Sequence, residues 1–355
     1  MARLRPVGDW IAGRFEIFAV HPGGMGVVYV AIDHQGSPGR RTLAIKTLRD
    51  EWLADPEWTA RFAAEGELWV ALGTHPNIVH AYSVEEFDGK PYILLELVTG
   101  GDLRRRINSG SITLPSALHL GIQFCLGMEH ATRQGLQCHR DVKPGNLMID
   151  GSGTLKITDF GLAVIRDELH ADGTITLDGT IPLANVTPTG LVVFDHADDR
   201  LPPLLVETPD PEAGLATTSR GPEGRAQATS GDASRLTQTG SLLGTLPYMA
   251  PEQFRDSKAV DVRADIYAFG VVLFRMLAGE LPFHGQTVAR LDRAHSRYTP
   301  PSVIGAIPRK YHKQAEAVDE IIQRCLKKEP DERYATIEDL RRALTRVAHR
   351  IEPKG

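Results

Sequence analysis

The feature that most constrains this chain is a polar segment, residues 138–146, followed at once by two short apolar runs. The runs, 147–149 and 155–157, are separated by Asp150-Gly151-Ser152-Gly153, a sequence typical of the turn in a β-hairpin. Asp159-Phe160-Gly161 comes directly after the hairpin. We therefore expect a rigid edge that presents four polar side chains together, those of Asp141, Lys143, Asn146 and Asp159.

Composition excludes several classes of protein. The chain has 355 residues, 42% of them hydrophobic, enough for one large two-lobed domain or two small ones. A net charge of -5 argues against a nucleic-acid partner. Three cysteines without Cys-x-x-Cys spacing indicate neither a disulfide framework nor a zinc site, and they favour a reducing compartment. No run approaches the roughly 20 apolar residues that span a bilayer, so we expect a cytoplasmic protein without a membrane segment.

Asp159-Phe160-Gly161 alone is weak evidence, because three common residue types often simply end a strand. Its position after His139-Arg140-Asp141 and the lysine and asparagine that follow is far more specific. Here the chain resembles the eukaryotic-like (Hanks-type) protein kinase family, in particular its bacterial serine/threonine members. The resemblance implies that Asp141 accepts a proton from the attacking hydroxyl and that Lys143 lies near the transferred phosphoryl group. It implies that Asn146 and Asp159 hold Mg²⁺ on the phosphates of ATP.

A glycine-rich turn lies between apolar runs at 15–20 and 27–30. Gly23, Gly24 and Gly26 would let backbone N–H groups approach phosphate oxygens, because no Cβ intervenes. An ordinary hairpin turn explains the same residues equally well. In the family this loop begins with a further glycine, where this chain has His21. The departure bears on loop flexibility and on the affinity for ATP.

A single lysine, Lys46, interrupts the apolar strand 43–48. A buried ammonium without a partner costs several kcal/mol, so Lys46 needs an anion or a route to solvent. The resemblance implies that it contacts the α- and β-phosphates and pairs with a carboxylate on the next helix, expected from an N-cap at Asp55 to about residue 72. Glu65 is the preferred partner and Glu67 the second choice. The alternative is that both are solvated helix carboxylates.

The resemblance also implies an adenine site beside the strand that ends at residue 98. Leu95 would be the gatekeeper, Glu96 to Val98 the hinge, and Asp102 the contact to ribose. Packing in an ordinary core is an equally good explanation of the residues that would enclose adenine. These enclosing residues are Val28, Ala44 and Met148.

Residues 115–134 have the apolar periodicity of a long helix. The side chains expected to face the core are those of Leu118, Ile122, Cys125, Leu126 and Met128.

Residues 166–236 are rich in Pro, Gly, Thr, Ser and Asp, a composition that cannot bury enough apolar surface to offset chain entropy. The resemblance places them in the activation segment. We expect a disordered insertion that acts as a linker and does not pack against the folded lobes. Thr237 and Thr239 follow it. By resemblance they are autophosphorylated, and Arg140 receives the phosphate through charge-assisted hydrogen bonds.

Residues 244–252 end in Ala250-Pro251-Glu252, which in the family belongs to the segment that receives a protein substrate. The resemblance gives Thr245 a place in that segment. It implies that Asp265 braces the catalytic loop and that Arg333 forms an ion pair with Glu252.

The resemblance covers residues 14–351 and implies an α+β, two-lobed protein kinase fold. The N-lobe, 14–98, would hold a five-stranded antiparallel sheet and one helix, the C-lobe, 99–351, would be mainly helical, and ATP would bind between them. The implied activity is ATP- and Mg²⁺-dependent phosphorylation of Ser/Thr in proteins, with Lys143 indicating serine/threonine rather than tyrosine specificity. Use of Mn²⁺ and a transient homodimer for trans-autophosphorylation are compatible with it.

Two alternatives stay open. A pseudokinase, or an ATP-binding signalling scaffold with little catalysis, would usually have lost Lys46, Asp141 or a metal ligand, all of which are present. A phosphotransferase acting on small molecules would be expected to lack Thr245 and residues 250–252, which are also present.

Overall fold

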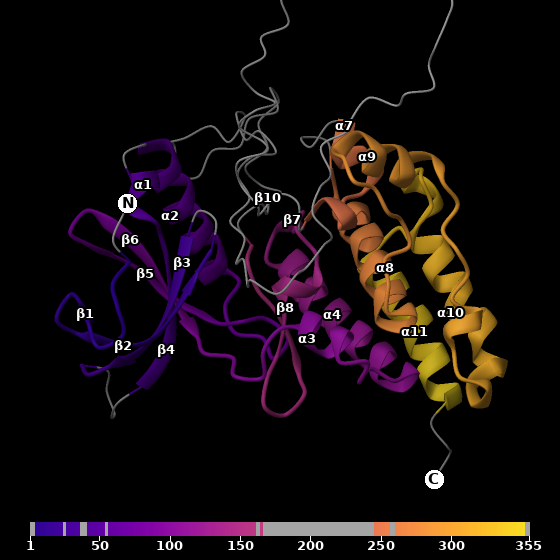
Figure 1. Cartoon of the computed structure of the whole chain (residues 1–355), viewed down its shortest axis with the longest axis horizontal. Helices are drawn as coiled ribbons and strands as arrows, with labels where there is room; N and C mark the ends of the chain where they lie inside the picture. The colour runs from indigo at the N-terminus through magenta and orange to yellow at the C-terminus, as the bar shows by residue number, and fades with distance from the viewer. Residues whose placement is uncertain are drawn as a thin grey trace, which may run out of the picture.

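The computed structural model describes residues 4–23, 26–35, 41–53, 56–160, 164–165, 245–255 and 260–351. These residues form a smaller lobe built on a β-sheet and a larger lobe built of helices, side by side (Figure 1). Several expectations from the sequence lie outside the described residues: those on Gly24, Asp55, Thr237, Thr239 and residues 166–236.

The sheet of the smaller lobe is antiparallel, with the strand order β1-β2-β3-β4-β6-β5. Its strands are β1 (Trp10–Ile11), β2 (Phe15–Pro22), β3 (Gly26–Asp33), β4 (Arg41–Leu48), β5 (Ala81–Phe87) and β6 (Lys90–Glu96). Five long strands match the expected sheet, and the two-residue β1 extends it at the edge. Because β2 runs to Pro22, His21 pairs with Val28 inside the sheet rather than lying in the turn.

Helix α2 (Pro56–Ala71) packs on β5 and β6, after a four-residue helix, α1 (Asp50–Leu53). The close approach depends on Gly66, where a Cβ would lie 2.6 Å from Val84 Cγ2. This packing brings the neighbouring Glu65 against the sheet.

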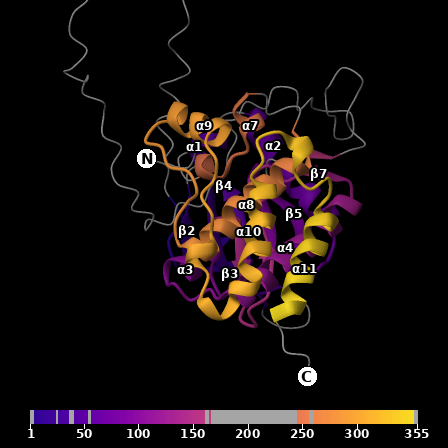
Figure 2. The ribbon, with the colours of Figure 1, turned by 90° about the vertical axis from the view of Figure 1, so that its right-hand side faces the viewer.

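The larger lobe is built around α4 (Leu114–Arg133) and α8 (Val262–Ala278), whose Phe124 and Phe269 rings stack with centroids 4.1 Å apart. Figure 2 shows α10 and α11 in front of α8 and α4. The remaining α-helices described are α3 (Leu103–Asn108), α7 (Pro251–Arg255), α9 (Val288–Arg297), α10 (His312–Cys325) and α11 (Ile337–Ile351).

One expectation for α4 is wrong. Leu118, Cys125 and Met128 are buried as expected, and Ile122 is half-buried, but the side chain of Leu126 is 37% exposed. Leu126 follows Cys125 by one residue, a rotation of about 100° around the helix. That rotation carries it out of the buried face.

The expected hairpin forms from β8 (Leu147–Ile149) and β9 (Leu155–Ile157). The Asp150 carboxylate shapes its turn by accepting the N–H groups of Ser152 and Thr154, each at 2.9 Å. Beside it β7 (Leu136–Cys138) pairs with β10 (Val164–Ile165). The N–H of Val79, in the segment that leads into β5, donates to the carbonyl of Ile157 at 2.9 Å. The hairpin is thereby tied to the smaller lobe.

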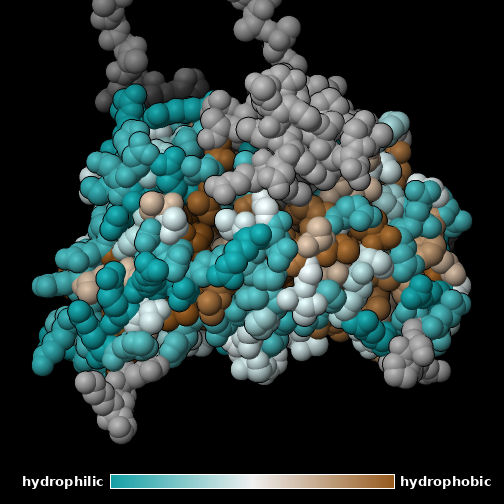
Figure 3. All heavy atoms as spheres, turned by 180° about the vertical axis from the view of Figure 1, so that it is seen from behind, coloured by the Kyte–Doolittle hydropathy of each residue, from teal (hydrophilic) through white to brown (hydrophobic). Residues whose placement is uncertain are grey.

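Hydrophilic residues dominate the side formed by α10 and α11 when the molecule is seen from behind (Figure 3). Among the described residues, no helix combines the length and the apolar character needed to cross a membrane.

Candidate functional site

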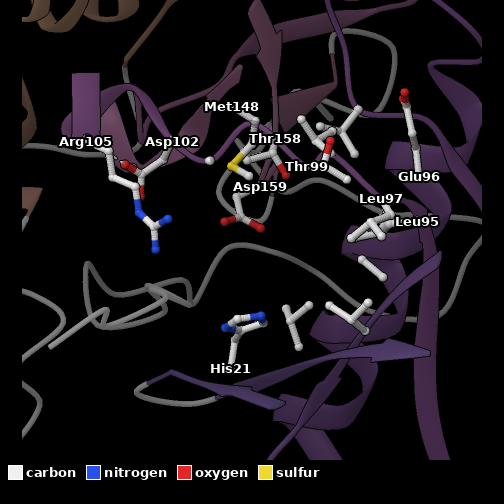
Figure 4. Close-up of a pocket in the computed structure, with 17 residues that line it drawn as sticks. His21, Leu95, Glu96, Leu97, Thr99, Asp102, Arg105, Met148, Thr158 and Asp159 are labelled. Carbon is white, nitrogen blue, oxygen red and sulfur yellow. Dashed lines mark hydrogen bonds between the residues drawn. The ribbon is translucent and has the colours of Figure 1, made fainter. Parts of the chain in front are cut away.

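A cavity of about 360 Å³ lies where the two lobes meet. Its size is typical of a site for a small organic ligand. Strands β2 to β4 form one wall, β6 and the segment after it form the back, and Met148 with Asp159 forms the opposite wall (Figure 4). All the residues expected at the adenine and ribose site line it, namely Val28, Ala44, Leu95, Glu96, Val98, Asp102 and Met148.

Sequence reasoning missed other lining residues. Apolar strand positions such as Val30 and Val79 carry no signal that separates them from ordinary core. Arg105 lies on a short helix among other arginines, where a charged side chain usually means solvent exposure. The missed residues are Val30, Val79, Thr99, Gly101, Arg105, Gly145 and Thr158.

Lys46 is fully buried in β4, and two carboxylates hold its ammonium group. Its Nζ donates to Glu65 Oε1 at 2.5 Å and to Asp159 Oδ1 at 3.0 Å. Burial alone would lower the pKa of Lys46, but Asp159 and Glu65 together raise it above its ordinary value. The other candidate partner, Glu67, is exposed. Lys46 therefore remains a cation, held against Asp159 in the wall of the cavity.

Packing of its neighbour Phe160 fixes the position of Asp159. The Phe160 ring is buried between Trp69 of α2 and His139, with ring centroids 5.7 and 4.8 Å away. Asp159 itself has a φ of +62°, a conformation that few residues other than glycine adopt. The Phe160 contact holds this backbone in place and directs the carboxylate into the cavity (Figure 4).

Asp141 lies at the centre of a buried hydrogen-bond network. Its Oδ2 accepts from Lys143 Nζ at 2.9 Å and from Asn146 Nδ2 at 2.8 Å. The Thr245 hydroxyl is 3.2 Å from Asp141 Oδ1, and it accepts from Lys143 Nζ at 2.8 Å. Thr245 belongs to the segment before α7, so a residue far along the chain completes this network. The arrangement places a carboxylate and an ammonium side by side, suited to proton transfer and to stabilising negative charge.

Asp265 of α8 holds the backbone that carries Asp141. Its two carboxylate oxygens accept the N–H groups of His139 at 2.7 Å and Arg140 at 2.8 Å. Burial raises the pKa of the Asp265 carboxyl, an effect that His139 and these two N–H groups oppose. Arg140 has a φ of +68°, so the loop needs such an anchor to keep an unfavourable conformation.

The segment after Thr245 is anchored by an ion pair between Glu252 of α7 and Arg333. Arg333 Nη1 and Nη2 donate to the two oxygens of Glu252 at 2.6 and 2.8 Å. The guanidinium is completely buried and also donates to three backbone carbonyls, those of Arg263, Lys327 and Lys328.

The site fits a divalent cation. Asp159 Oδ2 is buried and has no hydrogen-bond partner among the residues that the structure describes. The amide nitrogen of Asn146 is committed to Asp141, so its oxygen is the atom it could offer a metal. Hard cations such as Mg²⁺ prefer carboxylate and amide oxygens.

Two of the glycines expected to approach phosphate, Gly23 and Gly26, close the turn between β2 and β3. The N–H of Gly23 donates to the carbonyl of Gly26 at 2.9 Å.

Comparison with known proteins agrees with the geometry of this site. A family model described as "Protein kinase domain" matches residues 20–180 and 224–344. The chain is 30% identical over 336 residues to serine/threonine-protein kinase PrkC of Bacillus subtilis, covering 94% of this chain and 40% of that protein. It is 30% identical over 337 residues to serine/threonine-protein kinase PknB of Mycobacterium tuberculosis, covering 93% of this chain and 42% of that protein.

The chain thus spans about two fifths of the length of these curated relatives. Among solved structures it is similar to a mutant of the PknI kinase domain from Mycobacterium tuberculosis, with a TM-score of 0.58 and 21% sequence identity. That match covers 98% of this chain and 100% of the other, and it is a likeness of fold.

Proposed function

This chain belongs to the protein kinase domain family, with bacterial serine/threonine kinases among its relatives, and on that premise we propose that it phosphorylates proteins. The proposed reaction transfers the γ-phosphate of ATP to Ser or Thr and depends on Mg²⁺. The main support for the proposal is the hydrogen-bond network of Asp141, Lys143 and Thr245, together with the buried ion pair of Lys46 and Asp159.

The role proposed for each residue follows from its position in the site. The cavity between the lobes would take adenosine, and Lys46 would lie against the phosphates. Asn146 and Asp159 would hold Mg²⁺, which neutralises charge on the phosphates when it is bound. Asp141 would accept the proton of the substrate hydroxyl, and Lys143 would stabilise the charge on the transferred group.

The segment that contains Thr245 would bind the protein substrate and would couple its binding to the base through the Thr245 hydroxyl. Autophosphorylation at Thr237 and Thr239, with Arg140 as the phosphate receptor and a transient homodimer as the reacting species, is part of the same proposal. Action in the cytoplasm is also proposed, since Cys125, Cys138 and Cys325 are buried free thiols.

The experiment that tests the function is incubation with labelled ATP, Mg²⁺ and a generic protein substrate, followed by mapping of the labelled residues. We expect labelled Ser or Thr, with Thr237 and Thr239 among them. Asp141→Asn should reduce transfer by orders of magnitude while ATP binding and circular dichroism persist, because the base does not hold the nucleotide.

The matched control is Asp150→Asn, which alters a carboxylate in the β8–β9 turn and should leave transfer near the wild-type rate. Near-wild-type turnover by the Asp141 variant would refute the assignment.

A further inference from the structure

We propose that Arg105 is a second nucleotide-binding cation of this kinase, which contacts the phosphates of ATP from the open end of the cavity. The inference rests on the proposed function, because it requires ATP in this cavity. The family resemblance gives Arg105 no role.

The position of Arg105 is fixed by its helix. The carboxylate of Asp102 caps α3 by accepting the Arg105 N–H at 3.2 Å. The Arg105 side chain then runs past Gly101, where a Cβ would lie 3.2 Å from Arg105 Cδ. Gly101 has a φ of +81°, which favours glycine at this position, and its lack of a side chain leaves this path open.

The guanidinium of Arg105 points into the cavity rather than along the outer surface of α3 (Figure 4). In that view Glu96 and the segment after it lie to one side, and Arg105 lies on the other, with His21 across the hollow. A nucleotide with its base near Glu96 and its phosphates near Asp159 would extend toward Arg105. The phosphates, rather than the base, are therefore the part of ATP within its reach.

Among the described residues, Arg104 has an ion-pair partner and Arg105, which follows it in α3, does not. Arg104 Nη2 donates to Asp102 Oδ2 at 2.9 Å. Arg105 is exposed, and its guanidinium has no hydrogen-bond or ion-pair partner among the described residues. The nearby carboxylate of Asp102 is already occupied by Arg104 and by the helix cap. The charge of Arg105 is thus available to a ligand.

The charges around Asp159 leave a polyphosphate in this cavity in need of a further cation. The Lys46 ammonium is shared between Glu65 and Asp159, so these three groups together carry no surplus positive charge. A polyphosphate brings several negative charges into that environment. A guanidinium donates to phosphate oxygens in a bidentate, charge-assisted geometry, which the neutral ribose cannot match.

The test measures binding of ATP, ADP and adenosine to the purified full chain by calorimetry, with Arg105→Ala and Arg105→Lys. We expect Arg105→Ala to weaken ATP and ADP about tenfold and to change adenosine less than about twofold. Arg105→Lys should give an intermediate loss of affinity, because lysine keeps the positive charge but lacks the paired N–H groups of the guanidinium. The matched control is Arg342→Ala, which removes an exposed arginine of α11.

The outcomes separate the alternatives. Unchanged ATP and ADP affinities would overturn the inference, and so would an equal loss for all three ligands, since adenosine lacks phosphate. If Arg105→Ala raised only the KM of an acidic peptide substrate, Arg105 would contact the protein substrate and the inference would be wrong. Failure of the wild-type chain to bind any of the three ligands would instead remove the proposed function itself.

Discussion

A buried lysine is unfavourable unless anionic groups accept its hydrogen bonds, and Lys46 shows how the sequence achieves this. Its two acceptors come from α2 and from the residue before Phe160, two segments that are far apart in the chain. Gly66 and the Phe160 packing bring these segments together. Removing either carboxylate would leave the charge balance disturbed in a dry environment.

His21 provides a prediction at this scale. Its side chain lines the cavity from β2, so His21→Gly should weaken ATP binding by about 1 kcal/mol while kcat stays within about twofold. Titration calorimetry and steady-state kinetics measure the two effects. The control is Phe18→Gly in the same strand, where the side chain is 62% exposed and does not line the cavity. An unchanged ATP affinity for the His21 variant would show that the side chain at this position does not affect nucleotide binding.

Much of the site could be predicted from residues whose chemistry is rare in their context. A lysine within an apolar strand is conspicuous, and a helix carboxylate is its natural partner. Arg105 could not be found this way, because an arginine between two others on a short helix looks like solvated surface. Only the path of its side chain past Gly101 distinguishes it.

Among the elements, the β8–β9 hairpin formed within the bounds that the sequence indicated, because its turn chemistry is local. Local reasoning placed Leu126 on the wrong face of α4, since the edge of a helix's buried face depends on which elements pack beside it. Burial of Trp69 against Phe160 likewise depends on a contact distant in sequence.

The anchor of α7 gives a prediction at the scale of elements. Arg333→Lys should lower the free energy of unfolding by about 2–4 kcal/mol, because lysine cannot reproduce the fork that bonds both oxygens of Glu252 and three carbonyls. Urea unfolding measures it. The control is Arg324→Lys, an exposed arginine whose guanidinium lies 4.4 Å from the Tyr334 ring centroid, with an expected loss below about 1 kcal/mol. Equal losses in the two variants would contradict the anchor's importance.

For the whole molecule, the two-lobed α+β arrangement was predictable because the order of motifs along the chain is specific to one family. The added strand β1 was not, since two residues are too few for a recognisable pattern. The acid sensitivity of the folded protein could not be predicted either. It depends on which histidines are buried, and His295 is completely buried in α9.

His295 should make the folded molecule less stable in mild acid. Burial first, and the Lys328 ammonium second, lower the pKa of His295 to about 3. Between about pH 6.5 and this value the unfolded chain binds a proton that the native state does not. Stability therefore falls as the pH falls, by about 1.4 kcal/mol per pH unit, or about 2 kcal/mol at pH 5.

Urea unfolding at pH 7, 6 and 5 measures this slope. His295→Asn should flatten it, whereas His349→Asn, on the exposed face of α11, should leave it as in the wild type. Equal slopes for the His295 variant and the wild type would exclude His295 as the source of acid sensitivity.

The contact between Trp69 and Phe160 also makes the molecule a fluorescence reporter of its own state. Trp69 is completely buried, its indole N–H donates to Val79 O at 2.7 Å, and its ring lies against the residue that positions Asp159. A rearrangement of Phe160 would change both the polarity around the indole and the quenching of its emission. Emission from Trp69, isolated by replacing the other three tryptophans, would thus follow the inner end of the cleft without an attached dye.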